Sequence, residues 1–79
     1  MALVLLFGKL ADIAGWRARP MAAATIAALT DLLAAEDPAL GEALRGPGVQ
    51  VALDQQLVRG DAALSDGSEV AFLPPMSGG

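Results

Sequence analysis

The stretch that decides the fold lies at residues 69–79 and reads Glu69-Val70-Ala71-Phe72-Leu73-Pro74-Pro75-Met76-Ser77-Gly78-Gly79. Its residues 70–73 form an apolar run, and together with Glu69 they predict a strand. Pro74 and Pro75 end that strand, because proline has no amide hydrogen for a sheet ladder and favours a stiff, extended backbone. Residues 74–79 span up to about 20 Å when extended. The pattern therefore predicts a domain over residues 1–73, followed by a stalk and a narrow tip over residues 74–79.

The tip carries no bulky side chain after Met76. Gly78 and Gly79 have no Cβ, and only glycine lets a backbone approach another protein very closely. This favours insertion of a free Gly79 carboxylate into a partner's cleft. On these residues alone an incidental, frayed end is the alternative, since glycine is common at chain termini.

Composition restricts the chemistry of the 79-residue chain. It contains no cysteine and no histidine, which removes disulfides, thiolate nucleophiles, the common zinc sites and the usual general base. A net charge of −4 argues against nucleic acid as a partner. No apolar run approaches the ~20 residues of a membrane span, so we expect a cytoplasmic protein without membrane contact. The 54% of hydrophobic residues exceeds the need of a small core and predicts a partner surface.

Residues 2–7 form a second apolar run and also predict a strand. Side chains alternate along a strand, which divides this run into two apolar sets: Val4 and Leu6 against Leu3, Leu5 and Phe7. In a sheet that is covered on one side only, one set is left for a partner. Residues 9–15 read as a connection with Lys9 as a solvated loop cation, and residues 16–23 predict an edge strand that proline and charge protect from aggregation.

Two helices are predicted in the middle of the chain. Thr25 caps the first helix, which is expected to end near Ala35. Asp37 and Pro38 supply the cap and the first-turn proline of a short second helix that reaches Leu44. The apolar face of the first helix is expected to comprise Ile26, Leu29, Leu32 and Leu33.

The rest of the chain predicts strands at residues 49–53 and 56–58, joined by a tight turn at Asp54-Gln55. The complete order of elements indicates an α+β, two-layer sandwich. Its mixed sheet has about five strands, with one main helix and a short second helix. The first and last strands are the most apolar, so we expect them to pair at the centre of the sheet.

A specific motif covers residues 66–79, which follow the pattern Asp-Gly-x-Glu-Val-Ala-Phe-x-Pro-Pro-x-x-Gly-Gly. With residues 51–58, and less closely residues 5–12, it resembles the small subunit of molybdopterin synthase. The chain departs from that family at Ala11-Asp12, where Arg-Glu is frequent, and at Asp54, where Asn is usual. The resemblance implies the β-grasp fold of ubiquitin and the role of a sulfur carrier in molybdenum cofactor synthesis.

The resemblance also implies a mechanism in which the chain is no enzyme on its own and binds no cofactor. An E1-like activating enzyme would consume ATP to adenylate the Gly79 carboxylate, which follows Gly78. A sulfur donor protein would then leave a thiocarboxylate on Gly79. The loaded tail would enter the large subunit of molybdopterin synthase, where its sulfur would attack cyclic pyranopterin monophosphate and build the dithiolene.

By the same resemblance, the large subunit contacts the uncovered face of the sheet and the tail. We expect Phe7 and Leu73 to be exposed on that face, because they lie opposite Leu6 and Phe72 by strand alternation. The candidate partner-binding residues are Phe7, Leu57, Leu73, Pro74, Pro75, Met76 and Ser77.

Other functions share a Gly-Gly ending. The sulfur carrier of thiazole synthesis is one, although its tails typically lack the double proline found at Pro74-Pro75. A ubiquitin-like protein modifier, whose Gly79 forms an isopeptide with a target lysine, is another. A plain β-grasp interaction module, for which deletion of Gly78 and Gly79 changes nothing, is the third.

Overall fold

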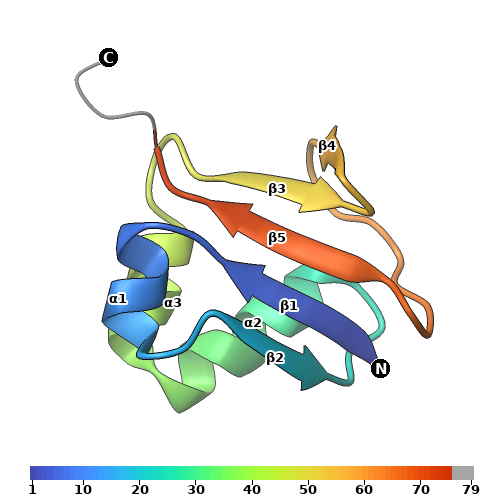
Figure 1. Ribbon diagram of the computed structural model, residues 1–79, viewed down its shortest axis with the longest axis horizontal. Coiled ribbons are helices and arrows are strands. Elements are labelled where there is room, and N and C mark those ends of the chain that lie inside the picture. The colour runs from blue at the N-terminus through green and yellow to red at the C-terminus, as the bar shows by residue number, and fades with distance from the viewer. Residues whose placement is uncertain (76–79) are drawn as a thin grey trace.

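Strand β5 (Glu69–Leu73) lies at the centre of the sheet. The computed structural model describes residues 1–75, in which five strands follow the order β2-β1-β5-β3-β4. Figure 1 shows β5 between β1 (Ala2–Leu6), to which it runs parallel, and β3 (Gln50–Leu53), to which it runs antiparallel. The predicted pairing of the first and last strands at the centre of a mixed sheet is confirmed.

Two short strands form the edges of the sheet. β2 (Ala18–Met21) pairs antiparallel with β1 and contains Pro20, so the predicted edge strand is confirmed. β4 (Gln56–Val58) pairs antiparallel with β3. Both edges are short, and short edge strands offer little backbone for unwanted pairing with another chain.

Helices α2 (Ile26–Glu36) and α3 (Pro38–Leu44) cover one face of the sheet, and the other face is open (Figure 1). α1 (Lys9–Ala14) packs beside α3 at one end of this layer. The arrangement is the predicted two-layer α+β sandwich. Within residues 1–75, no helix has the length and apolar content needed to cross a membrane.

Helix α1 corrects one sequence expectation, because residues 9–15 were expected to be only a connection. Leu10 and Ala11 are buried in the core, and this tertiary packing stabilises a helix too short to be stable alone. Gly15 ends the helix in the left-handed region (φ 82°), and its N–H donates to the Ala11 carbonyl at 2.8 Å. Lys9 is exposed as expected, although it lies on a helix and not in a loop.

The predicted helix caps are confirmed. The Thr25 hydroxyl accepts a hydrogen bond from the Ala28 N–H at 3.1 Å, and Asp37 Oδ1 accepts from the Leu40 N–H at 3.2 Å. A further acceptor comes from a distant loop and was not predicted from the sequence: Asp61 Oδ1 accepts a hydrogen bond from the Ala27 N–H of α2 at 2.8 Å. These acceptors satisfy amide groups that have no partner within the helix.

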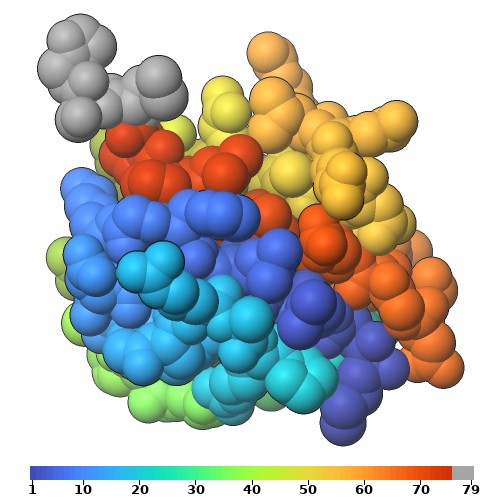
Figure 2. All heavy atoms as spheres, in the orientation of Figure 1, coloured from blue at the N-terminus to red at the C-terminus, as the bar shows by residue number. Residues whose placement is uncertain are grey.

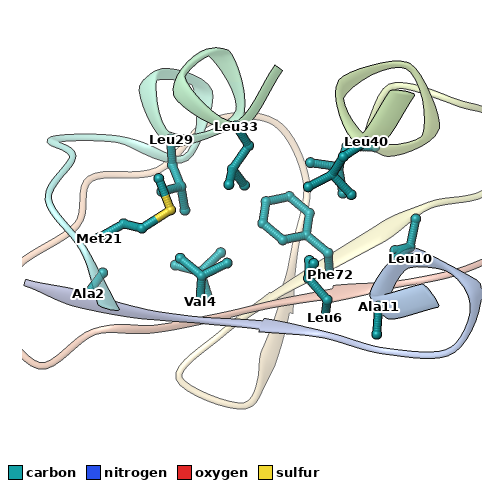
Figure 3. Close-up of a cluster of buried hydrophobic side chains, with 12 residues drawn as sticks. Ala2, Val4, Leu6, Leu10, Ala11, Met21, Leu29, Leu33, Leu40 and Phe72 are labelled. Atoms are coloured by element: carbon teal, nitrogen blue, oxygen red, sulfur yellow. The ribbon is translucent and has the colours of Figure 1, made fainter. Parts of the chain in front are cut away.

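The core lies between β1, β5 and the helices. Figure 3 shows Val4 and Leu6 of β1 and Phe72 of β5 pointing toward the helix layer. The side chains that meet them there include Leu29, Leu33 and Leu40. The predicted burial of one set of each strand is therefore confirmed.

Leu32 was expected on the buried face of the main helix, and this prediction is wrong. Its side chain is 45% exposed, whereas Leu29 and Leu33 are buried. Successive residues of an α-helix are separated by about 100°. Leu32 therefore points away from the stripe that Leu29 and Leu33 present to the sheet.

The turn between β3 and β4 is preserved although Asp replaces the usual Asn. Asp54 and Gln55 both have positive φ angles, 49° and 70°, as the tight turns of two-residue hairpins require. Asp tolerates this backbone region better than most residues. Its Oδ1 also accepts a hydrogen bond from the Glu69 N–H at 2.9 Å, which connects the turn to the central strand.

We expect Leu29→Ala to lower the free energy of unfolding by about 2–5 kcal/mol, because it empties a buried site. Leu32→Ala makes the same chemical change in the same helix at an exposed site, and we expect a change within roughly 0.5 kcal/mol. Urea unfolding followed by circular dichroism measures both. Equal losses for the two variants would contradict the assigned helix orientation.

Candidate functional site

The sheet face opposite the helices carries apolar side chains that are accessible to a partner. Phe7 is 45% exposed and Leu57 is 63% exposed, while Leu73 is half-buried. The predicted exposure of Phe7 is confirmed, whereas Leu73 is only partly exposed. Figure 2 shows this face, with β1 and β5 side by side across its middle. We call it the open face and define it by Leu3, Leu5, Phe7, Ala52, Leu57, Ala71 and Leu73.

One cross-strand row organises the open face. The register pairs Leu5 with Ala71, Ala71 with Ala52, and Ala52 with Leu57. Residues paired in this way project on the same side of a sheet. Two small alanine side chains thus lie between two leucines in this row, and Leu5 is also paired with Ala18 of β2. Alternation indicated Leu5 as outward-facing, but the register that brings it into this row depends on long-range pairing.

The open face continues to the point where the chain leaves the sheet. The Phe7 N–H donates to the Phe72 carbonyl at 3.3 Å, which extends the ladder by one step beyond β1. Pro74 and Pro75 follow β5 and are half-buried. The predictions on Met76, Ser77, Gly78 and Gly79 concern positions outside the described residues, and so they stay predictions, as does the division at residues 73 and 74.

A groove of about 310 Å³ adjoins Pro75 on the helix side of the molecule. Lys9, with its exposed ammonium group, lies at this groove. A larger groove of about 510 Å³ follows β3 and β4 at the edge of the sheet, with Leu57 and Arg59 in its lining. The smaller groove is lined by Lys9, Ile13, Ala43, Gly46, Pro47, Val49 and Pro75.

Two ion pairs with shifted pKa values lie outside the open face. Arg19 of β2 donates to Glu36 of α2 at 2.7 Å and lies 5.4 Å from the centre of the half-buried Trp16 ring. Its hydrogen bond lowers the pKa of the Glu36 carboxyl and raises the pKa of Arg19. The Met1 ammonium group likewise lowers the pKa of the Asp66 carboxyl through a hydrogen bond of 2.7 Å. We assign these groups a structural role, because none belongs to the open face or adjoins the two prolines.

Acidic side chains of the described domain do not gather into a metal site. Among residues 1–75, no group of three or more His, Cys, Asp or Glu side chains is placed to hold a metal ion. The described domain presents an exposed apolar surface next to Pro74 and Pro75, where the chain leaves the sheet. An exposed apolar surface of this kind is typical of a protein–protein contact site.

Comparison with known proteins matches residues 4–79 to the model of the ThiS family. The chain belongs to the ThiS family. It is also 38% identical, over 81 aligned positions that cover all of both chains, to the molybdopterin synthase sulfur carrier subunit of Escherichia coli strain K12. The resemblance found in the motif of residues 66–79 therefore extends over the complete chain.

Solved structures confirm the ubiquitin-like β-grasp fold. SAMP1 from Haloferax volcanii is 29% identical with a TM-score of 0.85, and the match covers 99% of this chain and 98% of that one. CysO of Mycobacterium tuberculosis, 21% identical with a TM-score of 0.81 over 96% of this chain and all of that one, shows the shared fold alone.

The chain has two phenylalanines, one on each side of the sheet, and they provide a test of the open face. We expect Phe72→Ala to cost about 3–5 kcal/mol of folding free energy, because it leaves a cavity in the core. Phe7→Ala should cost about 1 kcal/mol or less, because nearly half of that side chain is already in water. Urea unfolding of both variants checks this, and a cost for Phe7→Ala as large as that for Phe72→Ala would refute the open face.

Proposed function

We propose that this ThiS-family protein is a sulfur carrier whose Gly79 thiocarboxylate donates sulfur to cyclic pyranopterin monophosphate within molybdopterin synthase. The observation that carries the proposal is the full-length identity of 38% to a protein named as the sulfur carrier subunit of that enzyme. The double proline at residues 74 and 75 and the Gly-Gly ending support it. So does the open face, which lies beside the point where the tail leaves the sheet.

Loading requires two steps at Gly79. The carboxylate oxygen attacks the α-phosphorus of ATP in an E1-like activating enzyme, and pyrophosphate leaves. The resulting acyl adenylate has an electrophilic carbonyl carbon, which sulfur at the sulfide level from a donor protein attacks, and AMP leaves. The product is a thiocarboxylate, whose sulfur is a better nucleophile than the oxygen that it replaces.

Transfer takes place in the large subunit of molybdopterin synthase. The thiocarboxylate sulfur forms a C–S bond to a carbon of the pterin precursor as a C–O bond of that carbon breaks and its oxygen leaves. Water then hydrolyses the thioester, which leaves a thiolate on the pterin and returns the Gly79 carboxylate. Because a dithiolene holds two sulfurs, two loaded carriers are needed for each pterin. The carrier contributes the reactive end and the docking surface, and the large subunit contributes the catalytic side chains. The open face and Pro74 to Ser77 are the proposed contacts with that subunit, and we place the process in the cytoplasm.

A second candidate function is protein modification. Its support is the likeness to SAMP1 from Haloferax volcanii at 29% identity, since the full name given to the related Methanosarcina acetivorans structure is small archaeal modifier protein 1. The same Gly79 adenylate would then be attacked by a lysine amine of a target protein. The two functions share activation and differ in the nucleophile that follows it. Thiazole synthesis remains the third, and the double proline argues against it.

The loading step is tested by the intact mass of the protein after incubation with ATP, the activating enzyme and a sulfur donor. We expect a gain equal to sulfur in place of oxygen, localised to Gly79. One alanine added after Gly79 should abolish the gain in mass, because Gly79 then has no free carboxylate for the activating enzyme to adenylate. The extended variant should keep its urea midpoint, and normal loading of that variant would refute the mechanism. Attachment to target lysines, without loading, would favour the modifier function.

The docking surface is tested by a matched pair of substitutions, because Phe7 and Leu32 are each 45% exposed on opposite sides of the molecule. We expect Phe7→Ser to raise the Kd for the large subunit about 10- to 100-fold, the effect of losing an aromatic anchor. Leu32→Ser should leave the Kd within about twofold, as for surface positions outside an interface. Isothermal titration calorimetry measures both, and the reverse order would place the interface on the helix layer.

A further inference from the structure

Pro74 is seated against Gly8. The parallel register pairs Leu6 with Phe72, and two further residues along both chains bring Gly8 beside Pro74. A Cβ on Gly8 would lie 3.0 Å from Cγ of Pro74, well inside the 3.5–4.0 Å of a favourable carbon contact. Gly8 has a φ of 55°, in the region that favours glycine. The Pro74 ring therefore lies in the space that a side chain at position 8 would need.

Pro75 packs against Gly48 in the same way, on the side of β5 where β3 lies. The antiparallel register pairs Gln50 with Leu73, so that Gly48 comes beside Pro75 two residues further on. A Cβ on Gly48 would lie 2.7 Å from Cβ of Pro75, and the φ of Gly48 is 84°. Pro75 also lines the groove formed with Ile13 and Pro47. The chain thus has a glycine just after β1 and another just before β3, beside the two prolines that follow β5.

We propose that Gly8 and Gly48 are positioning residues that hold Pro74 and Pro75 from opposite sides and so set the direction in which the chain leaves the sheet. We call this arrangement the proline seat. A proline ring fixes its own φ angle, so a ring held on the sheet leaves little freedom in the chain's direction. Pre-orientation of this kind raises affinity for a narrow cleft, because less freedom is lost on entry.

The proline seat depends only on local contacts, whereas its effect on sulfur loading rests on the proposed function. A tail that leaves in the wrong direction is competent to enter the cleft for a smaller fraction of the time. The apparent affinity falls by that fraction, and the chemistry after entry is unchanged. The seat therefore predicts a rise in KM for the activating enzyme at an unchanged kcat.

The test compares Gly48→Ala with Gly67→Ala. The two glycines have nearly equal φ angles, 84° and 85°, but a Cβ on Gly67 would meet nothing within 4 Å. Both variants carry the strain of a left-handed alanine, and only Gly48→Ala displaces Pro75. We expect Gly48→Ala to raise KM for the activating enzyme roughly 5- to 20-fold with kcat within twofold, whereas Gly67→Ala leaves KM within twofold.

Two measurements do not depend on sulfur chemistry. In NMR spectra, Gly48→Ala should abolish the nuclear Overhauser contacts between residue 48 and the Pro75 ring and change the residual dipolar coupling of the Pro75 Cα–Hα bond, and Gly67→Ala should do neither. In urea unfolding, Gly48→Ala should lower the midpoint more than Gly67→Ala does. That excess should vanish in a Pro75→Gly background, which has no Cβ to collide with.

Equal KM values for the two glycine variants would overturn the positioning role. An unchanged Pro75 coupling in Gly48→Ala, or an excess destabilisation that survives in Pro75→Gly, would overturn the seat. If the wild-type protein is not loaded at all, the proposed function fails, and the NMR and unfolding measurements alone decide whether the seat directs the chain.

Discussion

The burial of Val70 and Phe72 under the helix layer is the contact on which the rest of the structure depends. Both side chains belong to β5, which has a strand on each side, and both are almost completely inaccessible to water. Because Val70 and Phe72 point toward the helices, the alternate residues of β5 point to the other side of the sheet. This places Ala71 at the middle of the open face. The burial of Val70 and Phe72 also fixes where the strand ends and hence where Pro74 begins. One strand therefore determines the core, the open face and the point where the chain leaves the sheet.

Local patterns were sufficient for most of the fold. Alternation assigned the faces of the two central strands, the caps at Thr25 and Asp37 marked both main helix starts, and proline identified an edge strand. The failures have physical reasons. Helix α1 has six residues, too few for a periodic signal, and depends on tertiary contacts of Leu10. Leu32 has the same chemistry as its buried neighbours, and only the helix phase relative to the sheet separates it from them.

The candidate site was predictable to the extent that it depends on one segment at a time. The tail motif and the outward direction of Phe7 follow from sequence order and alternation. The row that joins Leu5 to Leu57 through Ala71 and Ala52, and the proline seat, do not, because both depend on the pairing of β5 with β1 and with β3. Gly8 and Gly48 are indistinguishable in sequence from ordinary turn glycines. Their significance comes from the prolines that pairing brings beside them.

The parallel pairing of β1 with β5 has a consequence for folding. These strands come from opposite ends of the chain, so the sheet closes only after a large loss of chain entropy, whereas α2 and α3 rest on local contacts. Until β5 enters, β1 and β3 have no common neighbour, and neither half of the chain has a complete core. Folding is then expected to be all-or-none. A partner that contacts the open face together with the prolines after β5 would therefore recognise only folded molecules, because these surfaces come together only when β5 has paired.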